Sequence, residues 1–179
     1  MDEREKLAMF ERAVAPHFPA AFNLARWLVR NDQDAEDVVQ EASLRAYRAI
    51  GRRYGGDGRA WFLAIVRNAA YTWLQRSRRD EIFVALDDRP FEPASDSLNP
   101  ETALLSRLDR QAVADALDAL PVEFREIIIL RELEDMSYKQ IAEVTSLPIG
   151  TVMSRLARAR RRLQSGLAPS AGKELHREL

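Results

Sequence analysis

The residues best suited to binding chemistry lie in one basic segment near the C-terminal end of the chain, IGTVMSRLARARRRL at 149–163. Five of its fifteen residues are arginine and none is acidic, although the whole chain carries a formal net charge of -1. Guanidinium groups bind phosphates and read base edges, so a block without balancing acids favours contact with nucleic acid. The alternative is a solvated basic face, which is usual for isolated runs of charge.

The periodicity of this segment determines which arginines could reach DNA. At about 100° per residue, one face should pack on the preceding helices, and it comprises Ile149, Val152, Leu156, Ala159 and Leu163. The opposite face is centred on Ser154, Ala157, Arg158 and Arg161, and on one flank lie Thr151, Arg155 and Arg162. The small residues at 154 and 157 would allow close approach of the backbone to DNA, within reach of the arginines.

The elements before this segment predict a helix-turn-helix. Apolar residues suggest a helix that ends before Pro121, namely Leu105, Leu108, Ala112, Ala116 and Ala119. A second helix is expected over about 122–134, with Ile127, Ile128, Leu130 and Leu133 available for a core. In SYKQIAEV, Ser137 and Gln140 have the spacing of a capping box, and the turn SLP follows at 146–148. A short helix, a tight turn and a longer basic helix have the order of that motif.

A second candidate surface lies on a helix expected from about Arg59. Its apolar face comprises Phe62, Leu63, Val66, Ala69, Ala70, Trp73 and Leu74. Opposite lie Trp61, Ala64, Asn68, Tyr71 and Gln75, flanked by Arg67 and Arg78. Aromatic rings and an amide framed by arginine suit stacking and reading of a single strand. Packing of Trp61 and Tyr71 on another helix is the alternative, and for Trp61 the two readings stay open. The preceding loop, YGGDG at 54–58, could form a pocket wall.

The segment DAEDVVQEASLRAYRAI at 34–50 is predicted to be an amphipathic helix. Acids in its first turn suit the positive end of the helix dipole. A buried stripe is expected from Val38, Val39, Ala42, Ala46 and Ile50, which leaves Asp37, Gln40, Glu41 and Arg45 at the surface. A calcium loop is excluded because the required glycine at its sixth position and the closing glutamate are absent.

Composition and charge patterning define the rest. The chain has 179 residues and no cysteine, which excludes disulfides and thiolate sites, and its two histidines, His17 and His176, lie at opposite ends. Scarce glycine and helical spacing predict an all-α fold. An acidic segment with three prolines at 80–101 is typical of a linker between helical domains at 1–79 and 102–165, before a frayed tail at 166–179. The charged N-terminus is unlike a secretory signal, so a cytoplasmic protein without cofactor or metal is expected.

Residues 34–50 and 137–163 together resemble regions 2.2 and 4.2 of bacterial sigma factors, and the two-domain layout resembles their extracytoplasmic-function (ECF) class. The resemblance covers about residues 5–165. It implies two helical domains, region 2 and region 4, in a promoter-specificity subunit without catalytic residues of its own. The implied partners are the RNA polymerase core, through its β′ coiled coil and β flap, promoter DNA and an anti-sigma factor.

The resemblance also implies roles for particular residues. Asp37, Gln40, Glu41 and Arg45 match the surface that grips the β′ coiled coil. The loop at 55–58 and Asn68 match the part that captures a base of the -10 element on the non-template strand, and the basic surface beside it continues through Arg76, Arg78 and Arg79. We expect that site to comprise Gly56, Asp57, Trp61, Arg67, Asn68, Tyr71 and these three arginines. Met153, Ser154, Ala157 and Arg158 match positions that read the -35 element. The acidic linker, with Asp87, Asp88, Glu92 and Asp96, is hypothesised to run through the polymerase cleft.

Two other functions remain as alternatives. An ordinary helix-turn-helix regulator would bind DNA without polymerase core, and it would leave the outer face of the Trp61 helix without a purpose. A metal-dependent enzyme acting on DNA could use Asp32, Asp34 and Asp37 as ligands. Those acids lie at a helix start without a partner histidine or a second carboxylate cluster.

Overall fold

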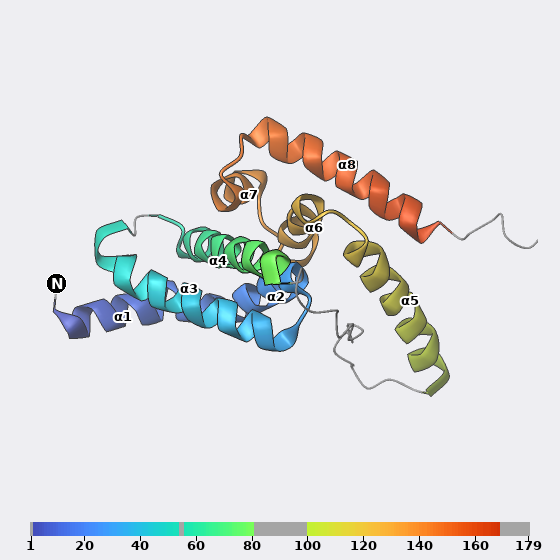
Figure 1. The fold of residues 1–179 in the computed structure, drawn as a ribbon. Helices are drawn as coiled ribbons and strands as arrows, with labels where there is room; N and C mark the ends of the chain where they lie inside the picture. The colour runs from blue at the N-terminus through green and yellow to red at the C-terminus, as the bar shows by residue number, and fades with distance from the viewer. Residues whose placement is uncertain (1, 54–55, 81–99, 169–179) are drawn as a thin grey trace, which may run out of the picture.

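A computed structural model of the chain describes residues 2–53, 56–80 and 100–168 (Figure 1). All regular elements in these ranges are helices, which agrees with the predicted all-α class. The structure does not describe the side chains of Arg53, Arg79, Asp80 and residues 100–108. Within the described ranges, no helix is both long and apolar enough to cross a membrane.

The first domain consists of helices α1 (Glu3–Ala13), α2 (Phe18–Val29), α3 (Asp32–Arg53) and α4 (Gly58–Asp80), with a 3₁₀ turn at Ala15–His17. Asp2 and Glu5 form a capping box at the start of α1. Arg30, in the left-handed region at φ 64°, ends α2 and turns the chain into α3. Helices α2, α3 and α4 pack against one another. Their shared core includes Leu24, Leu28, Ile50, Phe62 and Leu63.

The second domain consists of α5 (Pro100–Asp118), α6 (Val122–Ile128), a π-helical turn (Ile129–Leu133), α7 (Tyr138–Thr145) and α8 (Ile149–Leu167). Helix α8 packs on α5, α6 and α7. The core of this domain includes Ile127, Ile129, Leu130, Ile141 and Leu156.

Four apolar positions in the second domain that the sequence pattern placed on a buried face are exposed. Leu133 is 52% exposed because the chain leaves the α-helical path in the π turn, where the Glu134 amide bonds to the carbonyl of Ile129. Ile149 is 46% exposed because it is the first residue of α8, beyond the neighbouring helices. Ala112 and Ala119 are exposed, since the buried stripe of α5 follows Ala114 and Leu117 together with the expected Ala116. Helix α8 also continues through Leu167, past the predicted start of the tail.

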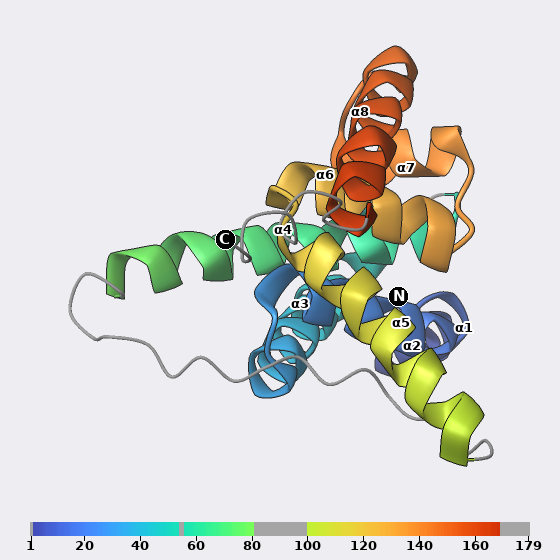
Figure 2. The same cartoon turned by 90° about the vertical axis from the view of Figure 1, so that its right-hand side faces the viewer.

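The two domains lie against each other. Helix α4 packs against α7, and α2 packs against α6. Figures 1 and 2 show α6 and α7 on the α4 side of the first domain, with α8 as the outermost helix. The face of α4 that points away from its own domain is therefore turned toward the second domain.

Candidate nucleic-acid interface

The helix-turn-helix forms as the sequence predicts. The Ser137 hydroxyl accepts from the Gln140 amide, and the Gln140 side chain accepts from the Ser137 amide, which completes the capping box before α7. Ser146 ends α7 in the left-handed region at φ 56°. Helix α8 then begins after Pro148 and lies across α7. The turn fixes the direction in which α8 presents its side chains.

The outward face of α8 agrees with the helical wheel. Val152, Leu156 and Ala159 are buried against the domain. Met153 is 51% exposed, and Ser154, Ala157, Arg158 and Arg161 are exposed with it. The side chains of Arg158 and Arg161 lie along α8 itself, since their Nε atoms each lie 3.4 Å from the carbonyl oxygen four residues earlier. Their guanidinium groups are placed where an approaching phosphate or base edge could meet them.

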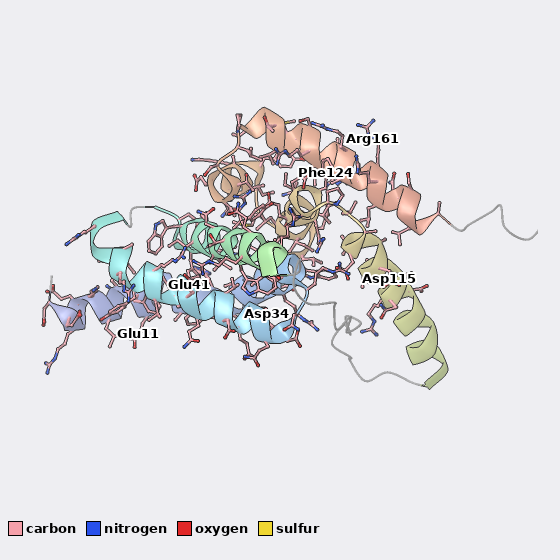
Figure 3. All side chains as sticks on the ribbon, viewed as in Figure 1. Glu11, Asp34, Glu41, Asp115, Phe124 and Arg161 are labelled. Atoms are coloured by element: carbon pink, nitrogen blue, oxygen red, sulfur yellow. The ribbon has the colours of Figure 1, made fainter. Side chains whose placement is uncertain are left out.

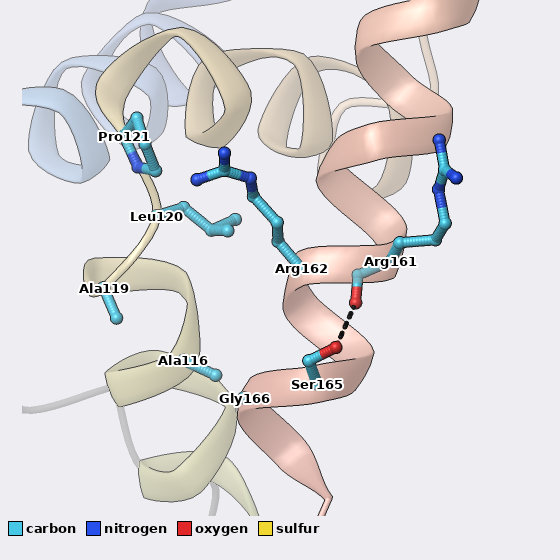
Figure 4. Close-up of a pocket in the computed structure, with 8 residues that line it drawn as sticks. All are labelled: Ala116, Ala119, Leu120, Pro121, Arg161, Arg162, Ser165 and Gly166. Carbon is cyan, nitrogen blue, oxygen red and sulfur yellow. Dashed lines mark hydrogen bonds between the residues drawn. The ribbon is translucent and has the colours of Figure 1, made fainter.

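The other arginines of α8 differ in their surroundings. Arg160 forms an ion pair with Glu132 of the π turn, with Nε 3.0 Å from Oε1. The Arg162 guanidinium lies over the ring of Phe124, 4.9 Å from its centre. Arg161 and Arg162 both line a pocket between the end of α5 and the end of α8, but their side chains point to different sides of α8 (Figure 4). Arg160 and Arg162 therefore contact other parts of the domain, whereas Arg158 and Arg161 lie on the outward face of α8.

The second candidate surface begins at the turn before α4. Gly56 has φ 125°, a conformation that L side chains rarely adopt. The Asp57 carboxylate accepts from the amides of Arg59 and Ala60 and so caps α4. Its pKa is lowered, first by the hydrogen bond from the Gln140 side chain of α7. Of this predicted pocket wall, residues 54–55 lie outside the described residues.

Residues of α4 that were predicted to face a single strand divide into two groups. Asn68, Arg76 and Arg78 are exposed. Trp61 packs partly on the core of the molecule, and Tyr71 is half-buried. Tyr71 contacts Glu126 of the second domain. The sequence analysis gave packing on another helix as the alternative for Tyr71, but it did not predict that this helix would belong to the other domain.

Arg67 and Tyr71 meet Glu126 of α6. The Arg67 guanidinium donates from Nε to Oε2 at 2.7 Å and from Nη2 to Oε1 at 3.0 Å, and it stacks 4.3 Å from the centre of the Tyr71 ring. The Glu126 side chain is completely buried. Burial raises the pKa of Glu126, partly offset by the Arg67 pair. Burial and the nearby carboxylate also hold the pKa of Tyr71 well above its usual value.

Further polar contacts join the domains on either side of this pair. Glu134 accepts from Arg59 of α4 at 2.8 Å and from Asn23 of α2. Arg125 donates to the carbonyl of Trp27 at 2.8 Å. Sequence reasoning missed Arg125, Glu126 and Glu134. A signal was available in FREIIIL at 124–130, where two charged residues lie inside an otherwise apolar run and must find partners when buried.

The surface predicted for polymerase lies on α3, away from the second domain. Asp37 and Gln40 are exposed, and Glu41 pairs with Arg45 one turn later. Glu41 and Asp34 lie along the same helix in Figure 3. At its N-terminal end, Asp32 pairs with Arg26 of α2, and burial raises the pKa of Asp34. Among the residues that the structure describes, no group of three acids or histidines could hold a metal ion.

Besides residues 54–55, the Arg79 side chain and residues 81–99 of the acidic linker lie outside the described residues.

Comparison with known proteins agrees with this geometry. Residues 13–80 match the family model "Sigma-70 region 2", and residues 110–163 match "Sigma-70, region 4". The chain is 32% identical over 167 residues to the ECF RNA polymerase sigma factor SigE of Mycolicibacterium smegmatis, covering 93% of this chain and 64% of that protein. It is 38% identical over 149 residues to the RNA polymerase sigma-H factor of Pseudomonas aeruginosa, covering 79% and 77%.

A solved structure is similar as well. The sigma factor RpoE of Bartonella quintana, crystallised in complex with the anti-sigma factor NepR, superposes with a TM-score of 0.71 at 30% identity, covering 88% of this chain and 96% of that one. The chain belongs to the sigma-70 family of RNA polymerase sigma factors, in its ECF class. The alternative of a helix-turn-helix regulator that works without polymerase is accordingly not favoured.

Proposed function

We propose that the chain binds the core of RNA polymerase and directs it to promoters, with α8 on the -35 element and the Gly56 turn and α4 on the -10 element. The observation that carries this proposal is the outward face of α8. Ser154, Ala157, Arg158 and Arg161 are exposed together on a helix whose opposite face is fixed in the domain core. This is the arrangement by which a recognition helix enters a major groove.

Polymerase binding is assigned to α3, through Asp37, Gln40, Glu41 and Arg45. These residues lie on the side of α3 opposite its buried stripe, so a partner could reach them without rearrangement of the domain. The residues that would melt and hold the -10 strand are Gly56, Asp57, Trp61, Arg67, Asn68, Tyr71, Arg76, Arg78 and Arg79. We also propose an anti-sigma factor as a regulatory partner, because the similar RpoE was crystallised with one. Binding to polymerase places the work of the chain in the cytoplasm.

Binding to core polymerase tests the proposal without knowledge of the promoter. Purified chain and core enzyme are expected to co-elute from a gel-filtration column as a holoenzyme. Glu41→Arg should abolish co-elution, because it reverses the charge at the centre of the α3 surface and removes the partner of Arg45. Glu11→Arg makes the same change at an exposed position on α1, outside the proposed contact, and should retain binding. Absence of co-elution for the parent chain would contradict the proposal.

A further inference from the structure

The part of α4 that we assign to the -10 strand is partly covered by the second domain. Arg67 and Tyr71 contact Glu126 of α6, and the capping Asp57 accepts a hydrogen bond from Gln140 of α7. Among the described residues of this surface, Gly56, Asp57, Asn68, Arg76 and Arg78 remain exposed, and Arg67 and Tyr71 do not. In this closed arrangement a single strand could not lie along the whole predicted surface.

The contact at Arg67 has the geometry of anion recognition. Nε and Nη2 each donate to a different oxygen of Glu126, and this bidentate geometry serves for carboxylates and phosphates alike. The Glu126 carboxylate is completely buried between the domains, so it offers one charge to one guanidinium in a low-dielectric site. A phosphate of the DNA backbone would need the same donors.

The remaining interdomain contacts hold this arrangement at both ends. The Glu134 carboxylate accepts hydrogen bonds from Arg59, near the start of α4, and from Asn23, in the middle of α2. Asp118 at the end of α5 lies 3.2 Å from Nε of Arg30, just past α2. The buried apolar residues of both domains belong to one hydrophobic cluster, so these charged and polar ties add to an apolar contact between the domains.

We propose that Glu126 is an internal occupant of the -10 surface, whose carboxylate takes the place of a DNA phosphate on Arg67 and keeps the unbound chain closed. The closed chain binds a single strand only when the domains separate, and Glu134 acts with Glu126 as a latch. This inference rests on the proposed function for the identity of the competing ligand. The closure itself is a property of the unbound chain and is measured without polymerase.

The distance between the domains reports the latch directly. Because the chain has no cysteine, Arg48→Cys on α3 and Gln164→Cys on α8 introduce two unique, exposed sites for nitroxide labels. Pulsed electron paramagnetic resonance should give one narrow distance distribution for the unbound parent. Glu126→Gln with Glu134→Gln should give a broad distribution at longer distances. A broad distribution in the parent, or a narrow one in the double variant, overturns the proposal.

Matched variants separate the latch from general effects of lost charge. Glu132→Gln removes a carboxylate two residues from Glu134 that pairs with Arg160 inside the second domain, and it should leave the parent distance unchanged. Thermal unfolding followed by circular dichroism checks that each variant is folded. If Glu126→Gln fails to fold, Glu134→Gln alone should still widen the distribution, and an unchanged distribution in that variant contradicts the latch.

Strand binding tests the competition. In fluorescence anisotropy with a fluorescein-labelled single-stranded DNA of random sequence, the double variant should bind about tenfold more tightly if the open form is about a tenth of the parent population. Adding Arg67→Ala should remove the gain. Equal affinity of parent and double variant contradicts the occupancy of Arg67 by Glu126. Core polymerase that fails to bind a chain with an intact latch would instead contradict the proposed function and leave the closure standing.

Discussion

Arg125 of α6 donates from Nη1 to the main-chain carbonyl of Trp27, 2.8 Å away, and so fastens the second domain to the last turn of α2. Carbonyls at that end of a helix have no partner within the helix. Nη2 of the same side chain donates to the carbonyl of Leu120 at 3.1 Å, and Asp118 lies 3.7 Å from Nη1. Arg125 is 6% exposed, so its loss would leave several buried acceptors without donors.

Arg125→Met should therefore lower the free energy of unfolding by about 3 kcal/mol, because breaking a buried, hydrogen-bonded charge pair leaves its partners uncompensated. Urea denaturation followed by circular dichroism measures the change. Arg160→Met is the matched control, since the Arg160–Glu132 pair is half exposed and should contribute no more than about 1 kcal/mol. Equal losses in the two variants would contradict the assigned role of Arg125.

Ser137→Ala should destabilise the second domain by about 1 kcal/mol, because the hydroxyl of Ser137 satisfies the amide of Gln140 at the start of α7. Ser154→Ala removes an exposed hydroxyl from the interior of α8 and should change the free energy of unfolding by about 0.5 kcal/mol or less. Thermal unfolding of both variants compares them directly. A Ser137→Ala variant as stable as the parent would show that the capping box contributes nothing.

Arg161→Ala should weaken the binding of holoenzyme to promoter DNA in a salt-dependent way. If the exposed Arg161 neutralises one phosphate, its loss should reduce the slope of log K against log salt concentration by about 1. Arg160→Ala removes the same charge from a side chain that is paired with Glu132 and should leave the slope unchanged. Titrations at several salt concentrations distinguish the two, and identical slopes for parent and Arg161→Ala would be the contrary result.

Glu126→Gln should change stability in a pH-dependent way. Burial raises the pKa of Glu126 above its ordinary value of 4.5, although the Arg67 pair opposes this, with Tyr71 and Arg155 also nearby. Between the two pKa values the folded chain binds more protons than the unfolded chain, so the stability of the parent decreases as pH rises through that window. Glutamine does not titrate, so the stability of the variant relative to the parent should increase from pH 4 toward neutral pH. Urea titrations of both chains measure the difference, and a relative stability that decreases over this range would show that the Arg67 pair dominates.

The sequence was sufficient for the elements that follow local rules. The capping box at Ser137 and the buried stripe at Val152, Leu156 and Ala159 depend on spacing within one helix, and both form. The positive φ of Gly56 before α4 was not predicted, because the glycine-rich loop indicated a turn without fixing its conformation.

Features that depend on contacts between distant parts of the chain could not be predicted from local sequence patterns. The exposure of Leu133 follows from a π turn, and no simple helical period predicts that change. The buried Glu126 pairs with Arg67, which is 59 residues away in sequence, and this pair depends on how the two domains meet. A helical wheel shows that Arg67 and Tyr71 face outward from their own domain, but it cannot show what lies opposite.

Run-off transcription tests the central claim most directly, that this chain directs polymerase to promoters through α8 and α4. Core polymerase with the purified chain is incubated with fragmented genomic DNA as template, and transcripts are mapped to their start sites. Discrete transcripts should depend on the chain, be lost with Arg158→Ala and persist with Arg160→Ala. The same transcripts from core polymerase alone, or none with the folded parent chain bound to core, would contradict it.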